Sequence, residues 1–144
     1  MFNKLFLENL EKFKPYEIRA GALIEQMNGD KIKKICNSNK YDFKTVSGVK
    51  YEVKAEPSSL KTNNFFIEHF GYGKPSGLAI TKAHFYIITD TKKYYLISVE
   101  ELKKIVLKSG KICYTRDKLT IGHLIKTSLI IESSFLLGEH IEDI

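Results

Sequence analysis

The stretch KYDFKTVSGVKYEVKA, residues 40–55, decides the fold because its apolar side chains recur at every second position. Tyr41 and Phe43 precede a Ser-Gly pair that favours a turn, and Tyr51 and Val53 follow that pair. Alternation of this kind is typical of two antiparallel strands that share one buried face. The sequence therefore predicts a β-hairpin with alternating buried and exposed positions.

Helical periodicity precedes the hairpin. Apolar side chains in residues 2–13 recur at helical spacing until Pro15 interrupts them, which predicts a first short helix. Residues 16–27 continue on a helical path and reach an Asn-Gly pair where the chain can turn. Asp30 is then expected to cap a further short helix that runs through Cys36.

The second half of the chain combines both periods. Strands are predicted for FFIEHF (65–70), HFYIITD (84–90), YYLIS (94–98) and KICYTR (111–116), and a helix is predicted to open at Lys74-Pro75-Ser76. Ser98 and Glu101 form a capping box that predicts a helix ending at Gly110. Residues 118–144 give mixed signals and no assignment. No repeat or linker divides the chain, so we expect one domain over residues 1–144.

Composition limits the possible functions. The chain has 144 residues, 43% of them hydrophobic and 28% charged, which excludes disorder, collagen and coiled coil as its main character. Lys and Arg outnumber Asp and Glu by 23 to 17, and a net charge of +6 favours a polyanionic partner without identifying one. The two cysteines and four histidines lack zinc-site spacing, and no apolar run reaches membrane-spanning length. We expect a cytoplasmic protein that does not enter a membrane.

Three polar residues of the hairpin form the candidate site: Asp42, Glu52 and Lys54. Magnesium prefers oxygen ligands, and the two carboxylates together with the carbonyl of Val53 supply part of an octahedral shell that water and a phosphate oxygen can complete. Lys54 is expected to position the attacking water and to stabilise charge in the transition state. The pattern predicts phosphodiester hydrolysis with Mg²⁺, for which Mn²⁺ can substitute.

The length of the hairpin loop tests this hypothesis. A two-residue loop at positions 47–48 would place Asp42 opposite Val53, on the other face of the sheet from Glu52 and Lys54. A three-residue loop, or one bulge, places Asp42 opposite Glu52 or Lys54, so that the three polar groups share a face. Acid-x-lysine triplets are also common on solvated strands, and the residues alone leave that interpretation open.

Residues after the hairpin are candidates for contacts with DNA. Side chains with hydrogen-bond donors follow the hairpin on a loop and again at the predicted helix start, where a phosphate could bind. A solvated loop and a simple turn are the respective alternatives. These candidates are Lys61, Asn63, Asn64, Lys74 and Ser76.

The order of helix, hairpin, third strand, helix and strand over residues 16–107 resembles the αβββαβ core of the PD-(D/E)XK nuclease superfamily. GALIE, residues 21–25, is similar to the G-x-x-x-E of the first helix in the exonuclease branch, which implies that Glu25 is an outer or direct metal ligand. The resemblance implies an α/β fold with a mixed central sheet flanked by helices. Tyr41 replaces the proline of the family motif, and the Q-x-x-x-Y element of one exonuclease branch has no counterpart.

The compact size and residues 63–81 look more like the small endonucleases, including Holliday-junction resolvases. The resemblance thus implies a metal-dependent DNA endonuclease; a non-catalytic basic nucleic-acid-binding module and a restriction-type or exonuclease-type deoxyribonuclease are the alternatives. We expect a homodimer, because two copies of one site can cut two strands. Residues 128–138, SLIIESSFLLG, are the candidate apolar interface, with ordinary core as the other interpretation.

Overall fold

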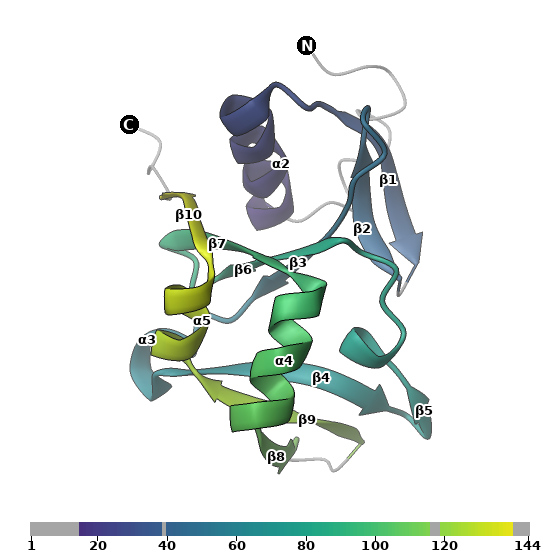
Figure 1. The fold of residues 1–144 in the computed structure, drawn as a ribbon. Coiled ribbons are helices and arrows are strands. Elements are labelled where there is room, and N and C mark those ends of the chain that lie inside the picture. Colours follow the sequence, from purple (N-terminus) through teal and green to yellow (C-terminus); the bar gives the residue numbers. More distant parts are fainter. Residues whose placement is uncertain (1–14, 39, 116–118, 140–144) are drawn as a thin grey trace.

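A computed structural model describes residues 15–38, 40–115 and 119–139, and the helix expected over residues 2–13 lies outside them. The chain has a mixed α/β fold in which a six-stranded central sheet is flanked by helices (Figure 1). The strands of this sheet are, in spatial order, β1 (Ile32–Ser38), β2 (Tyr41–Thr45), β3 (Lys50–Ala55), β6 (Phe85–Thr89), β7 (Lys93–Ser98) and β10 (Phe135–Glu139). The expected fold class is confirmed.

A second sheet of four antiparallel strands lies below the central sheet in the view of Figure 1. Its strands are, in spatial order, β5 (Lys74–Pro75), β4 (Asn64–Gly71), β9 (Thr120–Lys126) and β8 (Lys111–Tyr114). The helices are α2 (Pro15–Asn28), α3 (Ser59–Thr62), α4 (Val99–Ser109) and α5 (Thr127–Ser133), with a 3₁₀ turn η2 at Gly77–Ala79. None of the helices in these residues is long and apolar enough to cross a membrane.

The central sheet is mixed because β3 and β6 run parallel, whereas the other strand pairs of this sheet are antiparallel. Two apolar cores cover its faces. Helix α2 packs on one face against Phe43, Tyr51 and Val53. On the other face Tyr86 and Ile88 pack with residues of the second sheet, α4 and α5. Side chains alternate along a strand, so the side chain of Val53 points into the core beneath α2 and that of Glu52 points to the other face of the sheet.

The hairpin loop has the odd length that the candidate site requires. Phe43 lies opposite Tyr51, and the amide of Thr45 donates to the carbonyl of Val49, which leaves three residues in the loop. The third loop residue, Gly48, has φ +91°, a left-handed conformation that a residue with a Cβ rarely adopts. Continuing the register by one residue places Asp42 opposite Glu52.

Two further expectations about this region are settled by the structure. Helix α2 ends at Asn28 as predicted, and Gly29 follows it with φ +75°. The short helix predicted after Asp30 is wrong, because residues 32–38 form strand β1 against β2. The Asp30 carboxylate instead accepts hydrogen bonds from the hydroxyl of Thr45 and from the amide and hydroxyl of Ser47, so it anchors the hairpin loop.

Residues 65–70 form a strand, as predicted, but that strand is β4 of the second sheet and not a neighbour of the hairpin. It pairs with β9, which lies in the segment that the sequence left unassigned. The helix predicted to open at Lys74 is also wrong, since Lys74 and Pro75 form strand β5 and only the short 3₁₀ turn η2 follows. Gly77 has φ +51°, and a Cβ at this position would collide with the carbonyl oxygen of Glu68.

The strands predicted over 84–90 and 94–98 are confirmed as β6 and β7. Of the strand predicted over 111–116, residues 111–114 form β8, and residue 116 lies outside the described residues. Helix α4 begins and ends as the sequence indicates, because the Ser98 hydroxyl accepts a hydrogen bond from the amide of Glu101 and the helix stops at Gly110.

Candidate metal and nucleic-acid site

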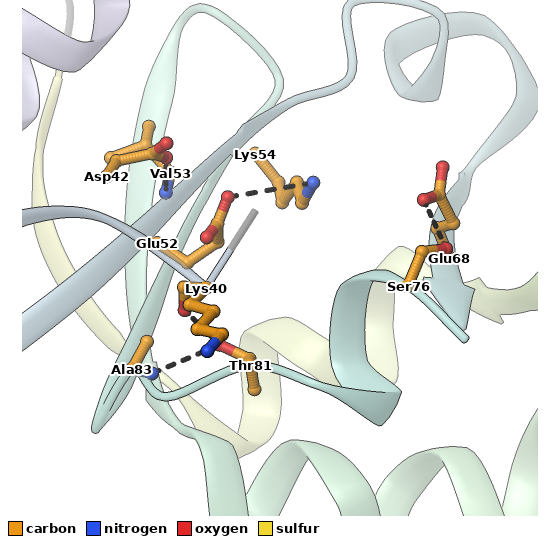
Figure 2. Close-up of polar contacts among 9 residues, drawn as sticks. All are labelled: Lys40, Asp42, Glu52, Val53, Lys54, Glu68, Ser76, Thr81 and Ala83. Atoms are coloured by element: carbon orange, nitrogen blue, oxygen red, sulfur yellow. Dashed lines mark hydrogen bonds and ion pairs between the residues drawn. The ribbon is translucent and has the colours of Figure 1, made fainter. Parts of the chain in front are cut away.

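Asp42 lies where strands β2 and β3 separate. Phe43 pairs with Tyr51, and the backbone pairing of the two strands ends before Asp42. Beyond that point a side chain links the strands, since Oδ2 of Asp42 accepts a 2.7 Å hydrogen bond from the amide of Val53 (Figure 2). The N–H and C=O of one strand residue point to the same side, so the carbonyl of Val53 lies on the side of β3 that faces Asp42.

Glu52 and Lys54 lie on one face of β3. Their side chains form an ion pair in which Nζ of Lys54 lies 3.7 Å from Oε1 of Glu52. The Glu52 side chain is only 11% exposed, whereas that of Lys54 is 38% exposed and reaches solvent. The structure therefore brings together the three residues predicted from the hairpin, and it does so through the odd loop.

The Glu52 carboxyl titrates abnormally because of this environment. Burial raises its pKa most, and the neighbouring charge of Asp42 raises it further, while the ammonium of Lys54 opposes both; the outcome is a pKa of about 8. Asp42 and Glu17 contribute like charge at short range. Without a bound cation Glu52 therefore holds a proton at neutral pH, because the site does not stabilise both carboxylates in their charged forms.

A pocket of 330 Å³ opens over these groups. It is lined by Tyr16, Glu17, Asp42, Glu52, Val53, Lys54 and Ala55. Two of these residues come from the first turn of α2, so the helix start closes one side of the pocket.

Glu25 does not reach this pocket. It is exposed on α2, whereas the buried positions of the helix are Ala20, Gly21, Leu23 and Ile24. The pocket is lined instead by Glu17, eight residues earlier and about 12 Å away along the helix axis. The structure therefore gives no support to the metal-ligand role expected for Glu25. The missed signal was Pro15, which marks the helix start and therefore the turn nearest the hairpin.

The predicted DNA contacts lie outside the pocket lining. Lys61, Asn63 and Lys74 are exposed, as contact with a phosphate requires. The side-chain amide of Asn64 donates a hydrogen bond to the carbonyl of Thr62. The hydroxyl of Ser76 donates a 2.6 Å hydrogen bond to Glu68, and this pair lies apart from Asp42 and Glu52 in Figure 2.

Tyr86 is a neighbour of the site that the sequence did not indicate. It lies next to Glu52 in the parallel β3–β6 register, and its hydroxyl is buried. Burial raises the pKa of this phenol, and the charge of Glu52 raises it further. Its position could be read only from the strand pairing, because α3, β4, β5 and η2 lie between β3 and β6 in the chain.

The donor set suits a hard cation that needs few protein ligands. Among residues 15–38, 40–115 and 119–139, no three His, Cys, Asp or Glu side chains are grouped so that they could hold a metal ion. Magnesium, however, commonly binds through one or two carboxylates and keeps several waters. Asp42, Glu52 and the Val53 carbonyl fit that requirement.

A scan against protein-family models and a search of curated proteins found no match to this chain.

Proposed function

We propose that this chain is a metal-dependent DNA endonuclease that hydrolyses phosphodiester bonds, with branched DNA such as a four-way junction as its substrate. The observation that carries the proposal is the proximity of the Asp42 and Glu52 carboxyl groups where β2 and β3 separate, with Lys54 beside Glu52. Buried like charges are unfavourable unless a cation or a proton compensates them. A divalent cation does so while also attracting a phosphate.

In this proposal Asp42, Glu52 and the carbonyl of Val53 hold Mg²⁺ or Mn²⁺. The bound cation would supply Lewis-acid stabilisation of the phosphate and would lower the pKa of a water molecule. The Val53 amide keeps Asp42 in place through its hydrogen bond, so the carboxylate needs little reorganisation. Glu17 adds negative charge at the rim and is a candidate for a water-mediated contact.

Lys54 has a separate role. Its ammonium lies beside Glu52 and remains partly open to solvent, so it can approach a bound phosphate. An ammonium carries three N–H donors and no acceptor, so it is suited to orienting the attacking water and to stabilising negative charge in the transition state.

The exposed Lys61 and Lys74 and the net charge of +6 support DNA as the partner. A binding module without catalysis would share those features. It would gain nothing from a buried acidic pair, because carboxylates repel phosphate when no cation neutralises them. The acidic pair therefore favours the nuclease over the module.

The proposal includes a homodimer, in which two copies of the site face one substrate. Residues 128–138 contribute Ile130 and Leu137 to the core, yet Ile131, Phe135 and Leu136 are 43%, 57% and 48% exposed. Part of this segment is thus ordinary core, and its exposed apolar residues are the candidates for the proposed interface. Exposed apolar side chains at the end of an edge strand suit contact with a second copy.

The test is incubation of the purified chain with labelled linear, flapped and four-way DNA in Mg²⁺, Mn²⁺ or EDTA. Paired incisions on the four-way junction, abolished by EDTA, are the expected result. Nicks spread along linear DNA would support a nuclease of another type, while binding without cleavage under every condition would favour the module.

A further inference from the structure

A second hollow, with a volume of 460 Å³, lies between α4 and the second sheet. It shares no lining residue with the pocket around Asp42 and Glu52. Its walls are mostly aliphatic. The lining residues are Ile67, His69, Leu78, Ala79, Lys103, Val106, Leu107, Gly110, Ile112 and His123.

Two histidines lie side by side in this hollow. His69 comes from β4 and His123 from β9, and their ring centroids are 4.7 Å apart with planes tilted by 36°. The Nδ1 atom of each ring is buried and has no hydrogen-bond partner in the described residues. Buried polar atoms without a partner are uncommon in proteins and need an explanation.

The reachable nitrogen of each ring is Nε2. Of the ring nitrogens, only the Nδ1 atoms are buried from solvent, and neither imidazole makes a hydrogen bond with the described residues. Burial lowers the pKa of His123, and the neighbouring His69 lowers it further, so His123 is neutral at pH 7. A neutral imidazole carries one proton, and placing it on the open Nε2 allows it to be solvated or donated to a ligand.

The charge of the hollow has one sign. Lys103, His69 and His123 are its ionisable lining residues, and no acidic residue belongs to the lining. The next lysine, Lys104, instead pairs with Glu100 at 3.7 Å. An ammonium and two imidazole donors above aliphatic walls complement a molecule with an anionic head and an apolar body.

We infer that this hollow binds a small organic acid, with its carboxylate toward His69, His123 and Lys103 and its hydrocarbon part along Leu78, Val106 and Ile112. The inference concerns a site separate from the proposed nuclease centre and does not depend on it. The free imidazole donors and the absence of acidic lining residues select an acid over an amine or a neutral lipid.

Octanoate is the probe, and octanol and octylamine have the same body with a neutral or a cationic head. Calorimetric titration of the full chain is expected to give a Kd below about 1 mM for octanoate, and binding at least about tenfold weaker for the other two compounds. Histidine side-chain NMR signals should shift for His69 and His123 and stay unchanged for the exposed His84. Equal binding of octanol, or preference for octylamine, would overturn the inference.

Variants at exposed positions avoid loss of folding. Leu107 is 91% exposed at the rim, so Leu107→Glu and Leu107→Lys differ in charge while both remain solvated. The glutamate should weaken octanoate binding by about three- to tenfold, and the lysine should not weaken it. Lys103→Met should weaken binding by about tenfold, whereas the control Lys104→Met should leave it unchanged.

Identical octanoate affinity in both Leu107 variants and in Lys103→Met would overturn the assignment of an anionic ligand. Displacement of octanoate by a 20-base-pair DNA duplex at equimolar concentration would also contradict it and would assign the hollow to nucleic acid.

Discussion

The amide of Val53 donates a 2.7 Å hydrogen bond to the carboxylate of Asp42, at the point where strands β2 and β3 separate. A side chain thus replaces the backbone ladder and fixes one carboxylate of the candidate site to the strand that carries the other. The arrangement depends on a three-residue loop, and Asp30 secures that loop through Thr45 and Ser47.

The hydrogen bond and the charge of the Asp42 side chain can be tested separately by two substitutions. Asp42→Asn keeps an oxygen that accepts from Val53 but removes the charge, so the pKa of Glu52 should fall while the melting temperature stays near that of the wild type. Asp42→Ala also removes the acceptor and should lower the free energy of unfolding by about 1–3 kcal/mol. Carboxyl NMR titration of Glu52 and thermal melts measure both effects. An unchanged Glu52 pKa in Asp42→Asn would contradict the electrostatic coupling.

The raised pKa of Glu52 predicts a stability that depends on pH. Its pKa is about 8 in the fold and near 4.5 as the reference for the unfolded chain, so between these values the folded state binds more protons. Stability from this group therefore falls as pH rises from about 5 to about 8, by up to about 1.4 kcal/mol per pH unit.

Glu52→Gln cannot ionise, so the difference in unfolding free energy between it and the wild type isolates this contribution from other titrating groups. The variant should become the more stable protein above about pH 7 when EDTA is present. Added Mg²⁺ should raise the unfolding free energy of the wild type at alkaline pH and have little effect on that of the variant. Parallel stability curves for the two proteins over pH 5–8.5 would mean that Glu52 titrates normally.

DNA binding should weaken steeply with salt, because phosphate contacts release counterions. Lys61→Ala and Lys74→Ala should each reduce the slope of log K against log salt by about one. Lys108 is exposed on α4, so Lys108→Ala is the control and should leave the slope unchanged. Fluorescence anisotropy with a four-way junction gives these slopes. Equal slopes in all four proteins would remove both lysines from the proposed DNA surface.

The homodimer should depend on the exposed apolar residues of β10. Phe135→Glu is expected to weaken self-association by at least about tenfold, since it places a charge in an apolar contact. Leu60→Glu changes a similarly exposed leucine on α3 and serves as the control. Sedimentation at micromolar concentration decides the matter, and a wild-type protein that is monomeric with and without DNA would exclude paired cutting by a solution dimer.

Local patterns predicted much of this fold. The hairpin, α2, α4 with its Ser98 cap, and the β6–β7 pair were all readable because each has its own periodicity and turn residues. Parity within the hairpin even indicated which loop length would unite Asp42 with Glu52. These signals involve residues close in sequence.

Long-range pairing was not readable. Strand β4 was recognised, but its place in a second sheet depends on β9, more than 50 residues later, whose own pattern was mixed. The same limit explains Glu25: its motif suggested a ligand, yet which helix turn faces the pocket depends on how α2 packs against β3 and β10. The pair of His69 and His123 was hidden for this reason too, since each histidine looked isolated in the sequence.

The central claim is tested most directly by measuring how fast variants of the candidate site cleave a labelled four-way junction in Mg²⁺. Glu52→Gln, Asp42→Asn and Lys54→Ala should each lose at least about 100-fold in rate while still binding the junction, because they remove groups that act in the transition state. Glu25→Gln, exposed on the same helix that lines the pocket, should retain activity within about twofold. Full activity in Glu52→Gln, or equal loss in Glu25→Gln, would contradict the account.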